Sequence, residues 1–299
     1  GSQPVPFDGF YVENTYAGTN TLTITKSNSP IATTFYWSKD TKNWIEQDIT
    51  FSRTTTITMA EGEKVYMKSN KNGWSRGNSD NYIRISASQS HNVGGKITSL
   101  INDNDTLNNY CFATLFYRDT TLVDASDLIL PFTTLANGCY ISMFYGCSSL
   151  VNAPALPATT LATSCYDEMF SGCSSLTTAP ALPATTLANA CYDRMFVNCT
   201  SLTTAPALPA TTISERCYYL MFSSCTALVN APETLPATTL ADGCYEYMFN
   251  GCTSLTTAPA LPATTLADSC YKSMFEGCTA LTTAPATLPA NTLQTECYY

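Results

Sequence analysis

Charged side chains and histidine are scarce in this chain of 299 residues. Lys, Arg, Asp and Glu make up 12% of the sequence, which is about half the usual share. The net charge of −9 argues against nucleic-acid binding, because phosphate contacts need clustered Lys and Arg. Acid–base catalysis most often uses histidine, and the only one, His91, lies in a Gly-rich stretch where we expect a solvated linker residue. We therefore expect a non-enzymatic protein that needs no cofactor and no metal.

Long apolar runs are also missing, so the sequence predicts no membrane-spanning helix of about 18 residues or more. There is no signal peptide, but Gly1 and Ser2 are typical of a cloning remnant, so we expect the natural start to have been removed. At the other end, Cys297 begins a repeat that does not finish. Because repeat arrays need a terminal cap, truncation is the preferred interpretation and an unusual natural end is the alternative.

Internal repetition is what the sequence has in abundance. A block of the form Cys-Tyr-x-x-Met-Phe-x-Gly-Cys-x-Ser-Leu recurs with small variations from Cys139 onward, mostly every 26 residues and twice after 27, where a Thr is inserted. A degenerate first copy starts at Cys111, with Leu115 in place of Met and Asp119 in place of the second Cys. Residues 111–299 therefore contain about seven units and the start of an eighth.

The first half of each unit is predicted to be a short α-helix. The first Cys and the Met are four residues apart, which places both side chains on one helix face. Asn, Thr or Asp stands two residues before the first Cys in most units and suits a helix N-cap. A glycine near the second Cys, such as Gly146 or Gly172, suits the left-handed residue at a helix end.

The second half of each unit is predicted to be a short parallel strand. We expect Leu176 and Ala179 to face inward and Thr177 and Thr178 to face outward. Pro180 should end the strand, because proline has no N–H to donate to a sheet. One short strand and one short helix cannot bury their own apolar faces, so neighbouring units must complete each other's core.

The region before the repeats is predicted to be all-β. Apolar and polar side chains alternate over residues 21–25, 56–59, 64–67 and 82–85, as they do in half-buried strands, and turn residues separate these segments. We expect a β-sandwich over residues 3–90, and a linker over residues 91–110 with a hinge at residues 91–95. The complete expectation is an α+β fold, in which the sandwich is followed over residues 111–299 by a right-handed leucine-rich-repeat solenoid with short parallel strands and short helices.

The repeated block continues as Leu-Thr-Thr-Ala-Pro-x-Leu-Pro-Ala-Thr-Thr-Leu-Ala and resembles the BspA-like leucine-rich repeats of bacterial surface proteins. It is also similar to the 26-residue surface-protein repeat of bacterial lipoproteins. The resemblance covers residues 111–299. Residues 36–44, 62–66 and 95–100 resemble the β-domain that often precedes such arrays in proteins of gut anaerobes and their phages.

This resemblance implies display at the cell surface, adhesion or ligand binding, and no catalytic residues. The implied partner is a host or bacterial surface protein or a glycan. The implied location is extracellular, as an outer-membrane lipoprotein whose N-terminal lipid signal has been lost from this chain.

The 14 cysteines allow several interpretations. Zinc sites favour closely spaced Cys pairs with a second pair or histidines, which this spacing does not provide. Two cysteines at the ends of one helix would lie about 12 Å apart, which is beyond the roughly 7 Å that a disulfide spans. Disulfides between equivalent positions of neighbouring units stay open. Buried free thiols that act as small apolar side chains are the preferred interpretation.

Tryptophans are the candidate binding residues of the N-terminal region. Trp37, Trp44 and Trp74, together with Tyr36 and Tyr82, fit a platform on which sugars stack. The preferred interpretation is that Trp37 and Trp44 are instead core residues of one hairpin.

The repeats carry a second set of candidates on the outer face of the predicted helices. The residues between the Cys-Tyr and Met-Phe pairs vary strongly, and include Asp167, Arg194, Tyr219, Tyr247 and Lys272. Tyr and Arg are enriched among the residues that dominate interfaces. Relaxed variation of an inert surface is the alternative, and the preferred one.

Three functions follow from these features. The first is a bacterial surface protein for adhesion or ligand binding, with the repeats as a recognition or spacer arm. The second is a carbohydrate-binding module in residues 1–90 on a structural stalk. The third is a fibre component of a phage or a secretion system.

Overall fold

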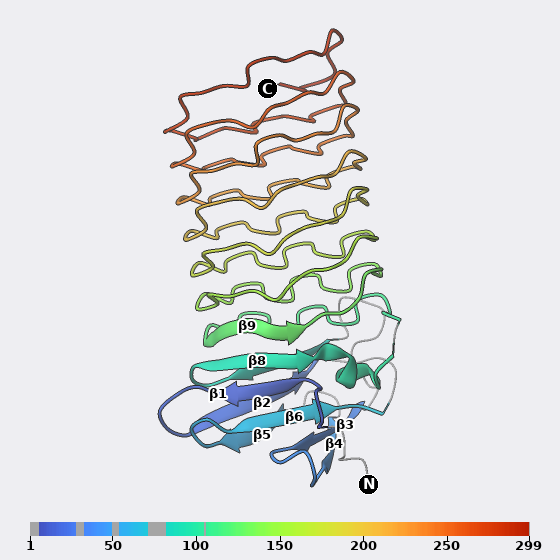
Figure 1. Cartoon of the computed structure of the whole chain (residues 1–299), viewed down its shortest axis with the longest axis vertical. Coiled ribbons are helices and arrows are strands. Elements are labelled where there is room, and N and C mark those ends of the chain that lie inside the picture. The colour runs from blue at the N-terminus through green and yellow to red at the C-terminus, as the bar shows by residue number, and fades with distance from the viewer. Residues whose placement is uncertain (1–5, 28–32, 50–53, 71–81, 105, 299) are drawn as a thin grey trace.

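Two β-sheets form the N-terminal part of the chain in the computed structural model, which describes residues 6–27, 33–49, 54–70, 82–104 and 106–298 (Figure 1). The larger sheet has the order β4-β3-β6-β1-β8-β9 and the smaller sheet the order β5-β2-β7. The strands are β1 (Tyr11–Asn14), β2 (Asn20–Lys26), β3 (Thr33–Ser38), β4 (Ile45–Ile49), β5 (Thr54–Met59), β6 (Lys64–Lys68), β7 (Ile83–Ala87), β8 (His91–Lys96) and β9 (Leu122–Ile129).

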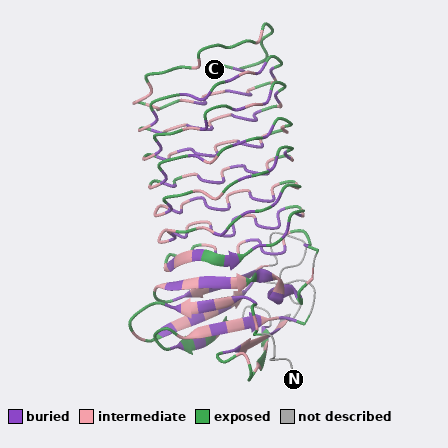
Figure 2. Ribbon diagram, in the orientation of Figure 1, coloured by how far each residue is buried: buried purple, intermediate pink, exposed green. Residues whose placement is uncertain are grey.

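Alternating side chains build the core between these sheets, as the banded colouring of the strands in Figure 2 shows. Leu22 and Ile24 of β2 and Val65 and Met67 of β6 are fully buried, while their neighbours along each strand are partly exposed. The strands predicted at residues 21–25, 56–59, 64–67 and 82–85 correspond to β2, β5, β6 and β7 and are confirmed. The all-β character of this region was therefore readable from period-two alternation.

The transition to the repeats is ordered secondary structure. Strand β8 pairs antiparallel with β1 and parallel with β9, which already belongs to the first repeat unit. A 3-10 helix, η1 (Ile97–Ile101), follows β8 directly. The hinge predicted at residues 91–95 is therefore wrong, because its backbone hydrogen bonds are used on both sides of a central strand. The division into residues 3–90, 91–110 and 111–299 stays a prediction.

Beyond β9 the repeat units are coils that lie one above another along the long axis of the molecule (Figure 1). Parallel bridges connect equivalent positions of successive coils, as at Asn152–Thr178 and Thr186–Thr212. The core runs without interruption from the sheets into this coil stack.

The α+β class and the leucine-rich-repeat solenoid predicted for residues 111–299 are wrong. No α-helix is present in the described part of the chain, and β9 is the only extended strand after η1 within it. The segments predicted as helices are successions of tight turns, and the predicted strands shrink to single bridges. The described structure is nearly all-β in its regular elements.

Left-handed backbone explains why the predicted helices do not form. In each coil three residues spaced by four have positive φ, as Gly138, Ser142 and Gly146 do at 57°, 51° and 71°. A right-handed α-helix tolerates no such residue in its interior. The apolar pairs Cys-Tyr and Met-Phe repeat every four residues because two residues point inward and the next two point outward. Over only two turns this spacing cannot be told from the helical spacing of 3.6 residues.

Hydrogen bonds within this segment, which we call the turn ribbon (residues 137–147 and its equivalents), alternate between two partners. The N–H of Met143 donates to the carbonyl of Tyr140 in the same coil, and the N–H of Phe144 donates to Met169 of the next coil, at 3.1 and 2.9 Å. Every second N–H thus leaves the coil and satisfies a carbonyl of its neighbour. This accounts for the backbone polar groups that a buried irregular segment must pair.

Identical side chains stack above one another inside the ribbon. The rings of Phe144, Phe170 and Phe196 follow each other at centroid distances of 5.4 and 5.7 Å, and their planes are within 8° of parallel. Tyr140, Tyr166 and Tyr192 form a second column with 5.8 Å spacing. All six rings are almost completely buried. Aromatic stacking and burial of large apolar surfaces therefore hold successive coils together.

The other half of each coil is flatter and closes the core from the opposite side. Leu176 and Leu182 are buried, whereas Thr177 and Thr178 are exposed, as predicted. Ala179, which we expected to face inward, is only partly buried. Pro180 limits pairing to the single bridge at Thr178, because it lacks an N–H.

Candidate functional site

The outward residues of the turn ribbon gather charged and aromatic side chains on adjacent coils. At the centre lies Asp193, which is only 3% exposed. Nη2 of Arg216 approaches its Oδ2 at 3.2 Å, and Nη1 of Arg194 lies 3.6 Å from its Oδ1. Two guanidinium groups therefore compensate one buried carboxylate in part, and burial still raises the pKa of Asp193.

Asp167 stands next to this pair on the preceding coil and is less well compensated. Burial, followed by repulsion from Asp193 and Glu168, raises the pKa of its carboxyl to about 7, and attraction to Arg194 and Arg216 opposes this only in part. Its Oδ1 is buried and has no hydrogen-bond partner among the described residues. Near neutral pH this position therefore alternates between a neutral and a negative side chain.

Aromatic rings extend the cluster toward the next coils. The Arg216 guanidinium lies 3.8 Å from the ring centroid of Tyr219, and Arg194 lies 5.4 Å from the same ring. Tyr247 meets Tyr219 edge to face at 6.2 Å. We call this set, Asp167, Glu168, Asp193, Arg194, Arg216, Tyr219 and Tyr247, the ribbon patch.

The ribbon patch contains four of the five residues that the sequence predicted on the repeats. Asp167, Arg194, Tyr219 and Tyr247 lie together, although on turns and not on helices. Lys272 lies farther along the stack, where it pairs with Glu296 at 2.6 Å.

Three members of the ribbon patch were missed. Glu168 and Asp193 stood at the variable positions but were not selected. Arg216 precedes the first Cys of its unit, where five other units carry Gly, Ser or Ala and the first and last carry Tyr110 and Glu296, and this contrast was the available signal.

The predicted aromatic platform is only partly assembled in the N-terminal region. Trp37 on β3 is half-buried and packs against the core, in line with its preferred interpretation. Trp44 contacts Phe7 edge to face at 5.0 Å, and Nζ of Lys68 lies 4.0 Å from its ring centroid. Trp74 lies outside the described residues.

A shallow hollow of about 420 Å³ lies beside Trp44. Nδ2 of Asn70 donates to Oη of Tyr36 at 3.1 Å, and the same hydroxyl donates to Glu46 at 2.9 Å. The hollow is lined by Tyr36, Trp44, Lys68, Ser69, Asn70 and Asn102. An aromatic ring beside amide and hydroxyl groups is a suitable surface for a hydroxylated ligand.

The expectation of a solvated His91 is wrong. Its side chain is fully buried, and Nε2 lies 3.0 Å from Oδ2 of Asp119. Thr121 donates its hydroxyl to Oδ1 of Asp119 at 3.0 Å, and Nδ1 of His91 lies 3.1 Å from the carbonyl oxygen of Gln89. Asp119 stands where later units have their second Cys. Its side chain contacts His91 of β8, whereas a later Cys such as Cys173 contacts the preceding coil. We assign this pair to the junction, since no solvent reaches either side chain.

The cysteines are internal packing and hydrogen-bonding groups. None of them forms a disulfide, and all but Cys278 are buried, which agrees with the preferred interpretation. The second Cys of each unit donates its thiol to the Phe carbonyl of the preceding coil, as Cys173 does to Phe144 at 3.1 Å. Burial raises the pKa of Cys165 to about 12. Thiolates, the form that reacts with electrophiles, are thus disfavoured in the stack.

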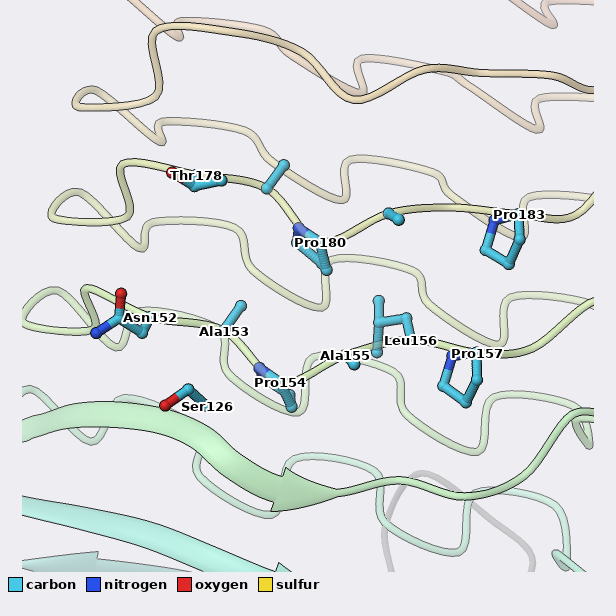
Figure 3. Close-up of a pocket in the computed structure, with 12 residues that line it drawn as sticks. Ser126, Asn152, Ala153, Pro154, Ala155, Leu156, Pro157, Thr178, Pro180 and Pro183 are labelled. Atoms are coloured by element: carbon cyan, nitrogen blue, oxygen red, sulfur yellow. The ribbon is translucent and has the colours of Figure 1, made fainter.

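A groove of about 550 Å³ runs over the flat side of the first coils (Figure 3). The rings of Pro154 and Pro180 lie above one another along it, and those of Pro157 and Pro183 form a second row. Its remaining lining comes mostly from Ala side chains, with Ser126, Asn152 and Thr178 at one end. It carries no charged group among its lining residues, so we place no candidate site there.

Within the described part of the chain, no group of three or more potential metal ligands gathers, and no helix is long and apolar enough to cross a membrane. Comparison of the chain with protein-family models, curated proteins and solved structures found no match. The assignment of a function therefore depends on the surface itself.

Proposed function

We propose that the protein is a non-enzymatic binding protein whose coil stack presents the ribbon patch to a protein or glycan partner. The observation that carries this proposal is the cluster of Tyr219, Tyr247, Arg194 and Arg216 around a buried carboxylate. Tyr and Arg supply large contact areas and many donors, and they dominate measured interface energies.

The rigidity of the support favours the same proposal. Each member of the ribbon patch is held by a coil whose backbone is bonded to its neighbours, for example Arg194 N–H to the Tyr219 carbonyl at 2.8 Å. A surface already ordered before binding loses little conformational entropy on association. Cell-surface location, lipid anchoring and adhesion rest on the resemblance of the repeats and belong to this proposal.

A panel of immobilised glycans and extracellular-matrix proteins, probed with the whole chain, tests this function. We expect binding that Arg194→Ala and Tyr219→Ala each weaken about 30-fold, because the loss of a dominant contact costs about 2 kcal/mol. Thr186→Ala, on the flat side of the stack, is the matched control and should bind normally. Absence of binding, or equal binding by all variants, would contradict the proposal.

Carbohydrate binding at the hollow beside Trp44 is a second candidate, favoured by the ring, the amides and the Lys68 ammonium that line it. Titration of the whole chain with soluble oligosaccharides should quench tryptophan fluorescence, and Asn70→Ala and Trp44→Phe should weaken this response. Unchanged unfolding midpoints would separate lost binding from lost structure. If both variants respond as the unaltered chain does, the hollow is not a sugar site.

A further inference from the structure

Two arginines at the junction between the sheets and the coils lack the acidic partner that other arginines have. Arg194 and Arg216 both pair with the carboxylate of Asp193. By contrast, the guanidinium groups of Arg84 on β7 and Arg118 on the first coil form no ion pair or hydrogen bond with the described residues. Both lie against tyrosine rings instead, so no described carboxylate balances their positive charge.

Arg84 is held in place by two of these rings. Its Cζ lies 4.0 Å from the ring centroid of Tyr82 and 4.3 Å from that of Tyr117. Nε is buried and has no acceptor among the described residues, so the two Nη groups are the donors that a ligand can reach. Burial, together with repulsion from Arg118, lowers the pKa of Arg84, and attraction to the two tyrosines opposes this shift. Because arginine stays charged at neutral pH, the structure presents a fixed cationic donor group here.

Arg118 brings a second guanidinium to the same place. Its Cζ lies 5.3 Å from the ring centroid of Tyr117 and 5.9 Å from that of Tyr145, and these two rings stack at 4.9 Å. Later coils have no aromatic residue at this position, where they carry Ser171, Val197, Ser223, Asn250 and Glu276. The stacked pair is therefore confined to the first two coils. We call Tyr82, Arg84, Tyr117, Arg118 and Tyr145 the junction patch.

The charges of the junction patch point to an anionic ligand. Guanidinium groups bind the oxygens of a carboxylate or a sulfate through paired hydrogen bonds, and both groups here have free donors. The net charge of −9 on the whole chain opposes the approach of a polyanion. The best match is therefore a ligand with a single anionic group, bound at short range.

The surroundings of the junction patch favour a sugar over a peptide. Arg84 lies opposite Thr25 on the outer face of the smaller sheet, and Oγ1 of Thr25 lies 3.4 Å from Oγ1 of Thr54 on the next strand. These hydroxyls and the nearby rings suit the hydroxyl groups and C–H faces of a sugar. A peptide strand would instead extend the sheet at β7, but the N–H of Ile85 on that edge already donates to the Leu115 carbonyl at 2.8 Å.

We propose that the junction patch binds a monoanionic sugar, either a uronic acid or a sugar sulfate ester. Its charged group is bound by Arg84 and Arg118, and its ring lies against the tyrosines. This site shares no residue with the ribbon patch or with the hollow beside Trp44, so it stands whether or not either of those binds a ligand.

Titration of the whole chain, followed by NMR at the Nε–H group of Arg84 and the ring protons of Tyr145, tests this site. The probes are methyl β-glucuronide, which carries a carboxylate, and glucose 6-sulfate, and methyl β-glucoside is the matched neutral sugar. We expect an acidic probe to shift these signals and to bind about tenfold more tightly than the neutral sugar, because hydrogen bonds to an anion are roughly twice as strong as neutral ones. The acidic probe that binds more tightly identifies the anionic group.

Variants of the two arginines locate the binding. Arg84→Gln and Arg118→Gln each remove one charge and should each weaken binding of the acidic probe about tenfold. Arg118 is exposed, so its variant keeps the fold even if Arg84→Gln lowers the unfolding midpoint. Arg194→Gln, in the ribbon patch, is the matched control and should bind the probe as the unaltered chain does.

Four other results would overturn the proposal. Equal binding of the neutral sugar would show stacking without an anion site, and equal affinity for inorganic sulfate would show an adventitious ion only. Tighter binding of the capped tripeptide Gly-Glu-Gly would identify an acidic peptide as the occupant. Absence of binding by both acidic probes, or binding that neither Arg84→Gln nor Arg118→Gln weakens, would show that the junction patch is a packing contact.

Discussion

The sheets and the coil stack use the same backbone chemistry in opposite ways. In the sheets, antiparallel neighbours such as β2 and β5 exchange hydrogen bonds in both directions, so the peptide dipoles largely cancel. In the ribbon, every inter-coil backbone hydrogen bond runs from one coil to the next toward the C-terminus, so the peptide dipoles add. The sheets therefore have edges that both donate and accept, whereas the ribbon has one donor end and one acceptor end.

The two regions also differ in how their cores are specified. The sheets bury varied side chains, and each fits its own surroundings. The stack buries the same six residue types, Cys, Tyr, Met, Phe, Leu and Ala, at the same positions of successive coils, so each layer is the template for the next. A mutation in the middle of the stack therefore affects two interfaces, and the same mutation at its end affects one.

Of the variants proposed here, Phe196→Ala should lower the free energy of unfolding most. It tests directly whether the middle of the stack is more sensitive to mutation than its end. The ring is fully buried and stacks on Phe170 and Phe222, at 5.7 and 5.6 Å. We expect a loss of about 3–5 kcal/mol in the free energy of unfolding, as for other buried aromatic residues. Phe275→Ala, with one stacking partner and a half-buried ring, should cost under about 2 kcal/mol. Urea denaturation of both variants checks this order, and equal losses would show that position in the stack is irrelevant.

The junction pair tests how the sheets and the stack are joined. His91→Ala removes the buried imidazole whose Nε2 lies 3.0 Å from the Asp119 carboxylate and leaves a cavity beside it, and should cost about 3 kcal/mol. The double variant His91→Leu with Asp119→Leu removes both polar groups and should be less destabilised than His91→Ala, because no polar side chain is left unpaired. The thermal unfolding midpoints of the two variants test this prediction, and the double variant should have the higher midpoint. A double variant that unfolds first would show that packing, and not the pair, governs this junction.

Gly172 tests the left-handed backbone conformation at the end of the turn ribbon. Its φ is 76°, and an added Cβ would come within 3.3 Å of the Cα of Gly146. Gly172→Val should therefore destabilise the protein by about 2 kcal/mol. Gly172→Asn is the matched control with a smaller cost, because Asn198 holds the equivalent position at φ 60°. If Gly172→Val is the milder change in urea denaturation, the left-handed conformation at this position is contradicted.

Substitution of Asp167 should change the stability of the fold least, and this change should depend on pH. Its pKa in the folded chain is about 7, above the ordinary value of 3.8, so the folded state binds the proton more tightly than the unfolded state. Its contribution to stability is therefore complete below pH 4 and is lost as the pH rises toward 7. Asp167→Asn should flatten this decline and stabilise the protein at pH 8 by about 1 kcal/mol, a value reduced for solvent screening. An unchanged pH profile of the unfolding midpoint would contradict this assignment.

The sequence predicted the repeat period, the buried thiols and four strands of the N-terminal region, β2, β5, β6 and β7. These features follow from side-chain pattern alone, because burial selects residue type. It failed on the turn ribbon, where pairs spaced by four residues over two turns fit a helix and a succession of turns equally well. Ser142, Glu168 and Leu220 adopt positive φ although their side chains do not favour it, so only the stacked neighbours determine that conformation.

The candidate site was predicted only in part, because its residue positions follow from the sequence pattern but the contacts between coils do not. Variable outward positions identified Asp167, Arg194, Tyr219 and Tyr247, and stacking brought them together. The contact between Arg216 and Asp193 depends on the offset between two coils, which no local pattern encodes. His91 was misplaced because Gly94 and Gly95 suggested a hinge, whereas their lack of side chains allows close packing: a Cβ on Gly95 would lie 2.0 Å from the Gly9 carbonyl oxygen.

Scalar couplings across hydrogen bonds, measured by NMR, test the one-way ribbon most directly. They connect the amide nitrogen of a donor to the carbonyl carbon of its acceptor and so identify each pair. The structure predicts couplings from Phe144 to Met169, from Phe170 to Met195 and from Phe196 to Met221, all in one direction. Couplings from these amides to carbonyls four residues earlier in the same coil would establish helices and contradict the ribbon.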